Sequence, residues 1–222
     1  MSTSILTADL FESVPDARAS QQEMAEGAVL LRGLARSFEA ELIADISDIV
    51  ARAPFRHMIT PGGHQMSVAM TNCGHLGWVT DRSGYRYDAN DPEAQKPWPA
   101  MPQSFRELAR CAAAQAGFGA FSPDACLVNR YQPGAKMSLH QDKDELDFGA
   151  PIVSVSLGLP AIFLFGGLKR GDKPRRFRLE HGDVVVWGGP ARLVYHGVAP
   201  LADGEHILLG RQRINLTFRK AR

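Results

Sequence analysis

Apolar residues recur with two different spacings along this chain, and the change falls near residue 120. Before it, apolar positions follow helical spacing in two segments, Ser37–Arg52 and Ser104–Gln115, which predicts two amphipathic helices. Ser37 suits the N-cap of the first helix, and Gly117 is expected to end the second. An apolar run over residues 28–31 predicts a strand ahead of both helices.

Beyond residue 120, most of the apolar runs have the length and composition of strands. Turn residues separate the runs, as at Pro133–Gly134 and Asp203–Gly204. The predicted strands are Cys126–Tyr131, Ile152–Leu157, Ile162–Phe165, Arg176–Leu179, Asp183–Trp187, Leu193–Tyr195 and Arg213–Arg219. Short strands at this spacing predict a mostly β fold with flanking helices, in the form of a sandwich, a barrel or a jelly roll.

Two segments follow neither spacing. Residues 1–25 are polar, and we expect a loose N-terminal leader ahead of a single domain over residues 26–222. Residues 54–102 hold many Gly and Pro together with aromatic residues such as Trp78, Tyr85 and Trp98. A long irregular segment in a compact domain is usually a functional lid or a linker, and the aromatic residues argue against a linker. We therefore expect residues 54–102 to form a lid.

The composition narrows the class of protein. The chain has 222 residues, of which 45% are hydrophobic, and a formal net charge of only +1. A protein that coats nucleic acid by bulk charge would be far more basic. The three cysteines form no Cys-x-x-Cys motif and cannot all pair, which is typical of reduced thiols in the cytoplasm.

Nothing in the sequence predicts export or a membrane partner. The N-terminal segment is acidic, whereas a signal peptide begins with basic residues and continues with apolar ones. The long uncharged stretch over residues 151–168 contains Gly158, Pro160 and Gly166, and its pattern alternates. We expect two buried strands there and a cytoplasmic protein.

His140-Gln141-Asp142 is the first candidate for chemistry. Residues two apart in an extended segment point to the same face, so this imidazole and carboxylate can bind one metal ion. His196, at the end of the predicted strand Leu193–Tyr195, could complete the two-His, one-carboxylate triad of non-haem Fe(II) oxygenases. His181-Gly182-Asp183 has the same spacing, but its central glycine and the apolar run that follows indicate a turn entering a strand.

The last predicted strand carries a second candidate. One face holds Arg213, Asn215, Thr217 and Arg219, and the other holds only apolar residues. The row is either a solvated face or the lining of a ligand cavity, where two arginines would suit a dicarboxylate. Arg213 and Arg219 lie roughly 20 Å apart along an extended backbone, so one of them could act only indirectly. Asn129 and Tyr131 form a shorter polar face of the same kind, with an ordinary buried strand as the alternative.

Basic residues cluster despite the balanced total. Residues 168–178 hold six lysines and arginines against a single Asp172. The cluster is either a solvated hairpin or, with the nearby aromatic residues, part of a groove for single-stranded nucleic acid. On the second interpretation, neutralising Arg175 and Arg176 would weaken DNA binding.

Taken together, these motifs resemble one family. The run from Asn129 to Asp144, then His196, and then the strand Arg213–Arg219 are similar to the bacterial AlkB-type DNA dealkylases, which are Fe(II)- and 2-oxoglutarate-dependent dioxygenases. Residues 66–78 of the expected lid are similar as well, and the similarity extends over most of the chain from about Gly27. The H-x-D…H and R-x-N-x-T-F-R elements are specific in combination, although neither is specific alone.

The resemblance implies a double-stranded β-helix, or jelly roll, in which residues 54–102 form a nucleotide-recognition lid. It implies Fe(II) bound by His140, Asp142 and His196, with O2 and 2-oxoglutarate as co-substrates. It implies 2-oxoglutarate contacts from Asn129, Tyr131, Arg213, Asn215 and Arg219. It implies nucleotide contacts from Met70, Trp78, Tyr85, Asp144 and Arg170.

The activity that the resemblance implies is oxidative demethylation of 1-methyladenine and 3-methylcytosine, with release of formaldehyde, succinate and CO2. The target base must leave the stack, which favours single-stranded DNA, with RNA as a further substrate. A monomer is expected. The alternatives are the same chemistry on RNA or protein, and a cupin-like metal-binding module without turnover, for which the arginine pair would have no purpose. A plain nucleic-acid-binding protein would have no use for the metal triad.

Overall fold

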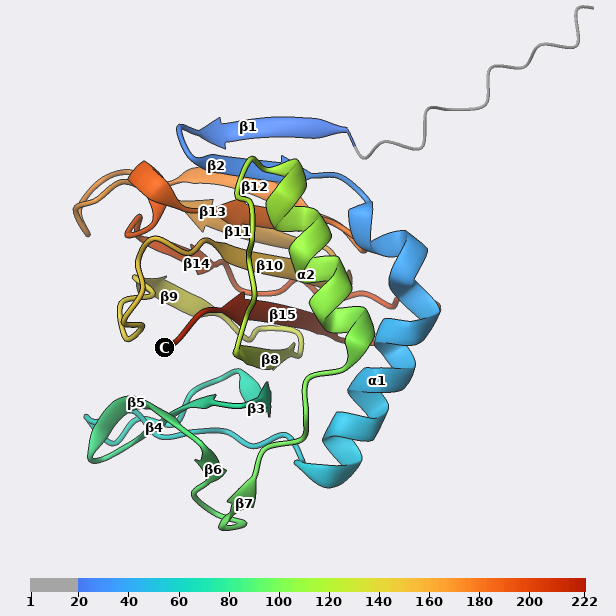
Figure 1. Cartoon of the computed structure of the whole chain (residues 1–222), viewed down its shortest axis with the longest axis vertical. Helices are drawn as coiled ribbons and strands as arrows, with labels where there is room; N and C mark the ends of the chain where they lie inside the picture. The colour runs from blue at the N-terminus through green and yellow to red at the C-terminus, as the bar shows by residue number, and fades with distance from the viewer. Residues whose placement is uncertain (1–19) are drawn as a thin grey trace, which may run out of the picture.

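The computed structural model describes residues 20–222, and its core is two antiparallel sheets packed face to face (Figure 1). The larger sheet has the order β1 (Gln21–Ala25), β2 (Ala28–Leu31), β13 (Val184–Trp187), β10 (Ile152–Gly158), β15 (Arg213–Arg219), β8 (Ala125–Tyr131) and β3 (Ala69–Gly74). The smaller has the order β12 (Arg175–Leu179), β11 (Ala161–Phe165), β14 (His196–Val198) and β9 (Met137–His140). Phe163 and Trp187 meet between the sheets with ring centroids 6.0 Å apart. The predicted jelly roll is confirmed.

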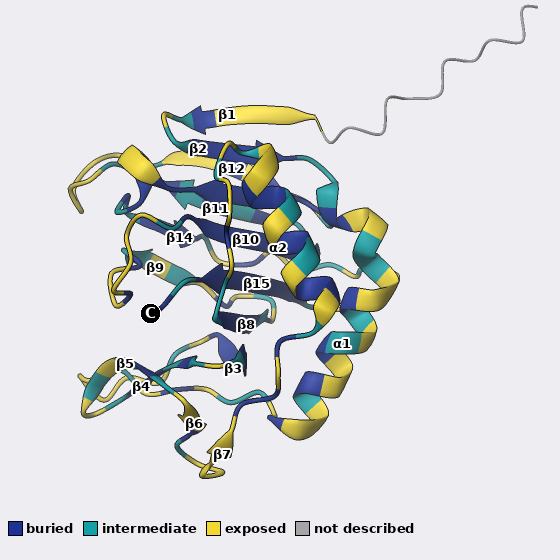
Figure 2. Cartoon of the chain, viewed as in Figure 1, coloured by how far each residue is buried: buried dark blue, intermediate teal, exposed yellow. Residues whose placement is uncertain are grey.

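Two helices cover the outer face of the larger sheet. These are α1 (Glu39–Arg52) and α2 (Gln103–Gln115), and Figure 2 shows their buried sides turned toward the strands. Phe105 of α2 meets Phe218 of β15 edge-to-face, with ring centroids 5.7 Å apart. Both helices were predicted, but Ser37 is not the N-cap of α1. Residues Leu34–Phe38 form a 3-10 helix, η1, and Phe38 takes the N-cap position without a side-chain hydrogen bond.

The second half of the chain follows the predicted strands with one exception. Residues Leu193–Tyr195 are not a strand, because Leu193 lies in a turn and the two residues after it are irregular. The strand β14 instead begins at His196 and pairs with β9, which the sequence did not predict. Gly197 allows this pairing, since a Cβ at that position would lie 2.6 Å from the carbonyl oxygen of Met137.

The segment 54–102 is more regular than predicted. Its strand β3 is an edge of the larger sheet, and the rest includes a separate hairpin of β4 (Gly77–Asp81) and β5 (Gly84–Asp88), followed by the short pair β6 (Asn90–Asp91) and β7 (Lys96–Pro97). The hairpin lies at the lower left of Figure 1, beside the open edge of the jelly roll.

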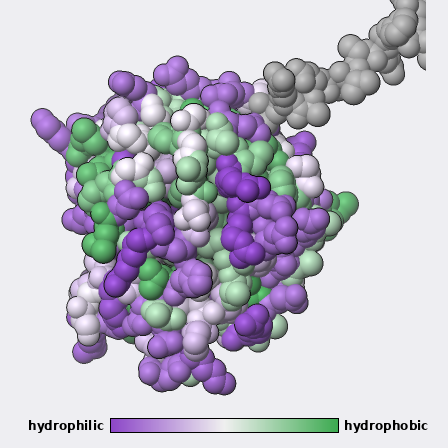
Figure 3. All heavy atoms as spheres, in the orientation of Figure 1, coloured by the Kyte–Doolittle hydropathy of each residue, from purple (hydrophilic) through white to green (hydrophobic). Residues whose placement is uncertain are grey.

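The predicted leader is too long at its C-terminal end. Residues Gln21–Ala25 form β1, paired with β2, and residues 1–19 lie outside the described part of the chain. No helix within residues 20–222 is long and apolar enough to span a membrane. Hydrophilic and hydrophobic side chains are interspersed on the face shown in Figure 3.

Candidate active site

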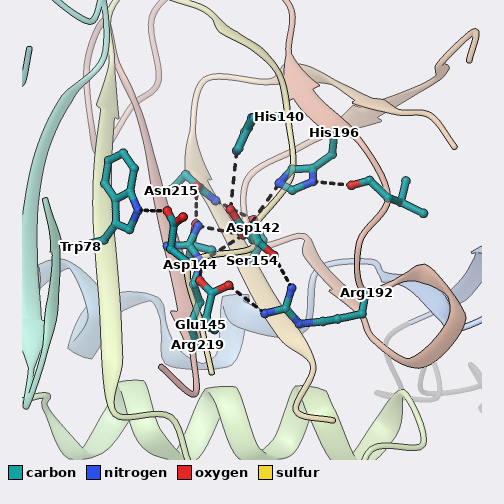
Figure 4. A network of polar contacts seen from close by, with 12 residues as sticks. Trp78, His140, Asp142, Asp144, Glu145, Ser154, Arg192, His196, Asn215 and Arg219 are labelled. Carbon is teal, nitrogen blue, oxygen red and sulfur yellow. Dashed lines mark hydrogen bonds and ion pairs between the residues drawn. The ribbon is translucent and has the colours of Figure 1, made fainter. Parts of the chain in front are cut away.

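The three predicted metal ligands meet at the open end of the smaller sheet (Figure 4). His140 ends β9 and His196 begins β14, and the two residues are direct partners in the antiparallel register. Asp142 lies two residues beyond β9. Its carboxylate oxygens are 3.7 Å from Nε2 of His140 and 3.9 Å from Nε2 of His196. One ligand atom from each of the three residues lies within 4.8 Å of the others, so all three can bind one ion.

Hydrogen bonds orient both imidazoles for metal binding. Nδ1 of His140 lies 2.9 Å from the carbonyl oxygen of Ser138, and Nδ1 of His196 lies 3.0 Å from that of Val194. A carbonyl only accepts, so each Nδ1 carries the proton and each Nε2 turns a lone pair toward Asp142. This arrangement fits the tautomer that a metal-binding histidine requires.

The protonation states of His196 and Asp142 also favour metal binding. Burial lowers the pKa of His196 to about 4, which keeps its ring neutral near pH 7. Burial alone would raise the pKa of Asp142, but the Arg219 guanidinium and the two imidazoles hold it well below its usual range. Arg219 donates to the Asp142 carboxylate at 2.8 and 3.0 Å. The site therefore offers two imidazoles, of which that of His196 is neutral, and one carboxylate, a donor set that suits Fe(II).

The polar row of β15 lines a pocket between the two sheets, as the cavity interpretation predicted. Arg213 lies at its inner end, 1% exposed, and donates from Nη2 to Ser156 at 2.9 Å. Its Nε and Nη1 have no hydrogen-bond partner, and no carboxylate among the described residues pairs with it. A buried guanidinium without a counter-ion is costly, so this pocket fits an anionic ligand such as a carboxylate of 2-oxoglutarate.

The other predicted co-substrate residues surround Arg213. The Tyr131 ring lies under the Arg213 guanidinium at 5.0 Å, and burial raises the pKa of this tyrosine, so its hydroxyl stays protonated. Asn129 donates to Asn215 at 3.3 Å, and its own side-chain oxygen has no partner in the described part of the chain. Arg219 differs from Arg213, since its guanidinium is already bound to Asp142.

The predicted nucleotide contacts do not all lie together. Trp78 and Tyr85 of the β4–β5 hairpin stack with ring centroids 5.7 Å apart, and the Trp78 indole donates to Asp144 at 2.8 Å. Tyr85 is half exposed. Arg170 is exposed on the turn between β11 and β12, apart from this group. Met70 is fully buried in the core cluster between the sheets rather than on the pocket lining.

The second H-x-D motif is structural, as its turn pattern indicated. Nδ1 of His181 accepts the main-chain N–H of Gly158, while Nε2 faces Glu39. Asp183 accepts hydrogen bonds from the main chain of Gly33 and from the Arg32 side chain.

Sequence reasoning missed three buried residues beside the metal site. Tyr87 of β5 donates to Glu145 at 2.5 Å, and Arg192 binds the other oxygen of Glu145 at 3.0 Å. Both partners of the Arg192–Glu145 ion pair are almost fully buried. No local pattern marks these residues, because each contact joins segments at least 47 positions apart.

Comparisons with known proteins agree with this geometry. The model of the 2OG-Fe(II) oxygenase superfamily matches residues 27–219. The chain is 62% identical to the alpha-ketoglutarate-dependent dioxygenase AlkB of Escherichia coli over 96% of this chain and 97% of that protein. It is 48% identical to an AlkB homolog of Caulobacter vibrioides over 77% of this chain and 76% of that one. The solved structure of OsALKBH1 superimposes with a TM-score of 0.79 at 30% identity, covering 90% of this chain and all of that one. The chain therefore belongs to the 2OG-Fe(II) oxygenase superfamily and, within it, to the AlkB family of alpha-ketoglutarate-dependent dioxygenases.

Proposed function

We propose that this dioxygenase repairs alkylated DNA by oxidative demethylation of 1-methyladenine and 3-methylcytosine. The observation that carries the proposal is the position of the Trp78–Tyr85 stack. It is joined through Asp144 to the same short segment that provides Asp142. An aromatic surface and a carboxylate beside an oxidising centre suit a flipped base that methylation has made cationic.

The residues take the following roles. His140, Asp142 and His196 hold Fe(II), while Asn129, Tyr131, Arg213, Asn215 and Arg219 hold 2-oxoglutarate directly or through a neighbour. Trp78, Tyr85 and Asp144 form the nucleotide site, Arg170 contacts the nucleic acid from the β11–β12 turn, and Met70 supports the site only from the core. Residues 54–102 form the lid of a single domain that begins with β1 rather than at residue 26.

Bound Fe(II), with 2-oxoglutarate and O2, supplies the chemistry that oxidises the N-methyl carbon, and the product then releases formaldehyde. The protein orients the reactants. Arg213 binds one co-substrate carboxylate, the carbonyl oxygens of Ser138 and Val194 hold the two imidazoles with Nε2 toward Asp142, and Arg219 keeps Asp142 ionised. Trp78 stacks on the target base, and Asp144 favours the cationic lesion over the neutral base.

We place the enzyme in the cytoplasm as a monomer that prefers single-stranded DNA, because the target base must leave its stack before it can reach the metal. RNA carrying the same lesions is a further substrate.

The test is the mass of the substrate strand after incubation with the enzyme, Fe(II), 2-oxoglutarate and ascorbate. Strands of one sequence carry 1-methyladenine as single-stranded DNA, as duplex DNA and as RNA. We expect loss of the methyl group to be fastest in single-stranded DNA. A methyl group that persists in all three strands refutes nucleic-acid repair, and faster loss from the duplex refutes the strand preference.

A further inference from the structure

Arg192 is a buried cation that belongs neither to the three metal ligands nor to the residues of the co-substrate pocket. It is 3% exposed and takes the C-cap position of the 3-10 helix η2 (Gly189–Ala191), four residues before His196. Two other arginines among the described residues, Arg213 and Arg219, are similarly buried. Both of those face the pocket between the sheets.

The Arg192 side chain binds the segment that contains Asp142 at three points. Nη1 donates to the main-chain oxygen of Asp142 at 2.6 Å, Nη2 to Glu145 at 3.0 Å, and Nε to the main-chain oxygen of Ala150 at 3.1 Å. Figure 4 shows the guanidinium reaching Glu145 and the Asp142 segment from the opposite side to Arg219. One side chain from the segment leading to His196 thus holds the segment that follows His140.

Asp142 needs such support more than the other two ligands do. His140 and His196 are fixed by the pairing of β9 with β14, whereas Asp142 lies in an irregular segment without a sheet ladder. Arg219 fixes its carboxylate and Arg192 fixes its main chain. We propose that Arg192 is a positioning residue for metal binding, which acts by holding Asp142 at the distance from His196 that one ion requires. The proposal rests on the metal triad proposed above.

The buried carboxylate of Glu145 makes the position of Asp142 depend on Arg192. Its Oε2 pairs with Arg192 at 3.0 Å, and its Oε1 lies 3.4 Å from Nε of Arg219. Without Arg192, the buried Glu145 carboxylate would keep only Arg219 as a cationic neighbour, and it would compete with Asp142 for that guanidinium. Loss of Arg192 therefore disturbs Asp142 through its main chain and through its carboxylate.

The experiment titrates the metal-free protein with Co(II), whose visible absorption reports both occupancy and coordination geometry. Arg192→Lys keeps the charge but cannot make three separate hydrogen bonds, and Arg192→Met removes the charge. We expect the Co(II) affinity of each variant to fall roughly 10-fold to 100-fold, as for other residues that orient metal ligands, with a changed absorption spectrum.

Arg32→Lys is the matched control, because Arg32 also binds a buried carboxylate, that of Asp183, and a main-chain oxygen, but away from the metal site. It should lower the melting temperature while leaving Co(II) affinity and spectrum unchanged. Arg192 variants that bind Co(II) within two-fold of the unmodified protein, with an unchanged spectrum, overturn the proposal.

If Arg192→Met does not fold, Arg192→Lys, which keeps the buried charge, carries the test alone, and unchanged Co(II) affinity and spectrum there overturn the proposal. An unmodified protein that takes up no Co(II) would refute the metal triad, and the role of Arg192 with it.

Discussion

Arg213 is the residue whose surroundings most directly indicate the binding of an anionic ligand. Its guanidinium is buried, and within residues 20–222 two of its nitrogens have no partner and no carboxylate pairs with it. Arg213→Met should therefore raise the KM for 2-oxoglutarate roughly 10-fold to 150-fold, the range expected for a lost hydrogen bond to a charged group. Steady-state kinetics with varied 2-oxoglutarate measure this. Arg211→Met is the control, since Arg211 is exposed and pairs with Asp203, and an equal rise in KM there would remove the argument for Arg213.

His140 and His181 provide a direct contrast between two identical motifs. His140→Ala removes a proposed metal ligand and should abolish both Co(II) binding and turnover. His181→Ala should leave turnover largely intact. It should lower the free energy of unfolding by about 1–3 kcal/mol, because the Gly158 N–H loses its acceptor. Activity assays and denaturant titrations separate the two effects, and a dead His181→Ala beside an active His140→Ala would reverse the assignment.

The neutral His196 predicts a pH dependence of the metal-free protein. Its pKa in the fold is lowered by burial to about 4, from an ordinary 6.5. Between these values the unfolded chain binds more protons than the folded one, so the free energy of unfolding should fall as the pH is lowered from 6.5 toward 4. His196→Asn should reduce this slope in denaturant titrations across that range. An unchanged slope would mean that His196 is not the group responsible.

At the scale of elements, the structure divides the basic cluster into two kinds of residue. Arg175 donates to the main-chain oxygen of Met24 in β1 and lies 5.0 Å over the Phe177 ring, so it helps to hold two strands together. Arg176 and Arg178 are exposed on β12, an edge of the smaller sheet. DNA binding therefore stays a prediction for Arg176, whereas Arg175 already contacts groups of the protein itself.

Arg176→Ser should weaken binding of a single-stranded oligonucleotide and reduce the salt dependence of its affinity by about one counterion. Arg175→Ser should mainly lower the melting temperature. Fluorescence anisotropy over a range of salt concentrations measures the first effect, with Arg211→Ser as an exposed control. If Arg176→Ser leaves both affinity and salt slope unchanged, β12 is only a solvated edge.

The sequence predicted those helices and strands whose pattern of apolar residues is visible within the element itself. The alternation over Arg213–Arg219 and the helical spacing over residues 104–115 both correspond to elements in the structure. The strand β14 has only three residues and includes a glycine, so its pairing with β9 depends on contacts that no short window contains. The strand β3 was not predicted either, because the glycines and aromatic residues of segment 54–102 indicated an irregular segment.

At the scale of the whole molecule, the jelly roll explains why the site was predictable in part. The sequence indicated the triad and the polar row of β15, since each lies within one segment or matches a family motif. It did not indicate Tyr87, Glu145 or Arg192, because their buried network forms only when the hairpin, the segment after β9 and the segment before β14 are brought together. That network joins the proposed lid to a proposed metal ligand.

The near-neutral net charge of the whole molecule bears on how it binds DNA. A net charge of +1 excludes tight binding to any DNA by bulk electrostatics. In the function proposed above, recognition of the lesion rests on the Trp78–Tyr85 stack, on Asp144 and on a few exposed arginines. Weak binding of undamaged DNA suits an enzyme that must release sites without a lesion.

The central claim is that oxidation of 2-oxoglutarate is coupled to base repair at this site. The most direct measurement counts succinate formed and adenine restored in one reaction with Fe(II), ascorbate and a 1-methyladenine oligonucleotide. We predict that the methylated strand stimulates succinate formation, with one succinate for each adenine restored, and that the unmethylated strand does not. Succinate formation that the methylated strand fails to stimulate, together with an intact methyl group, would contradict the account.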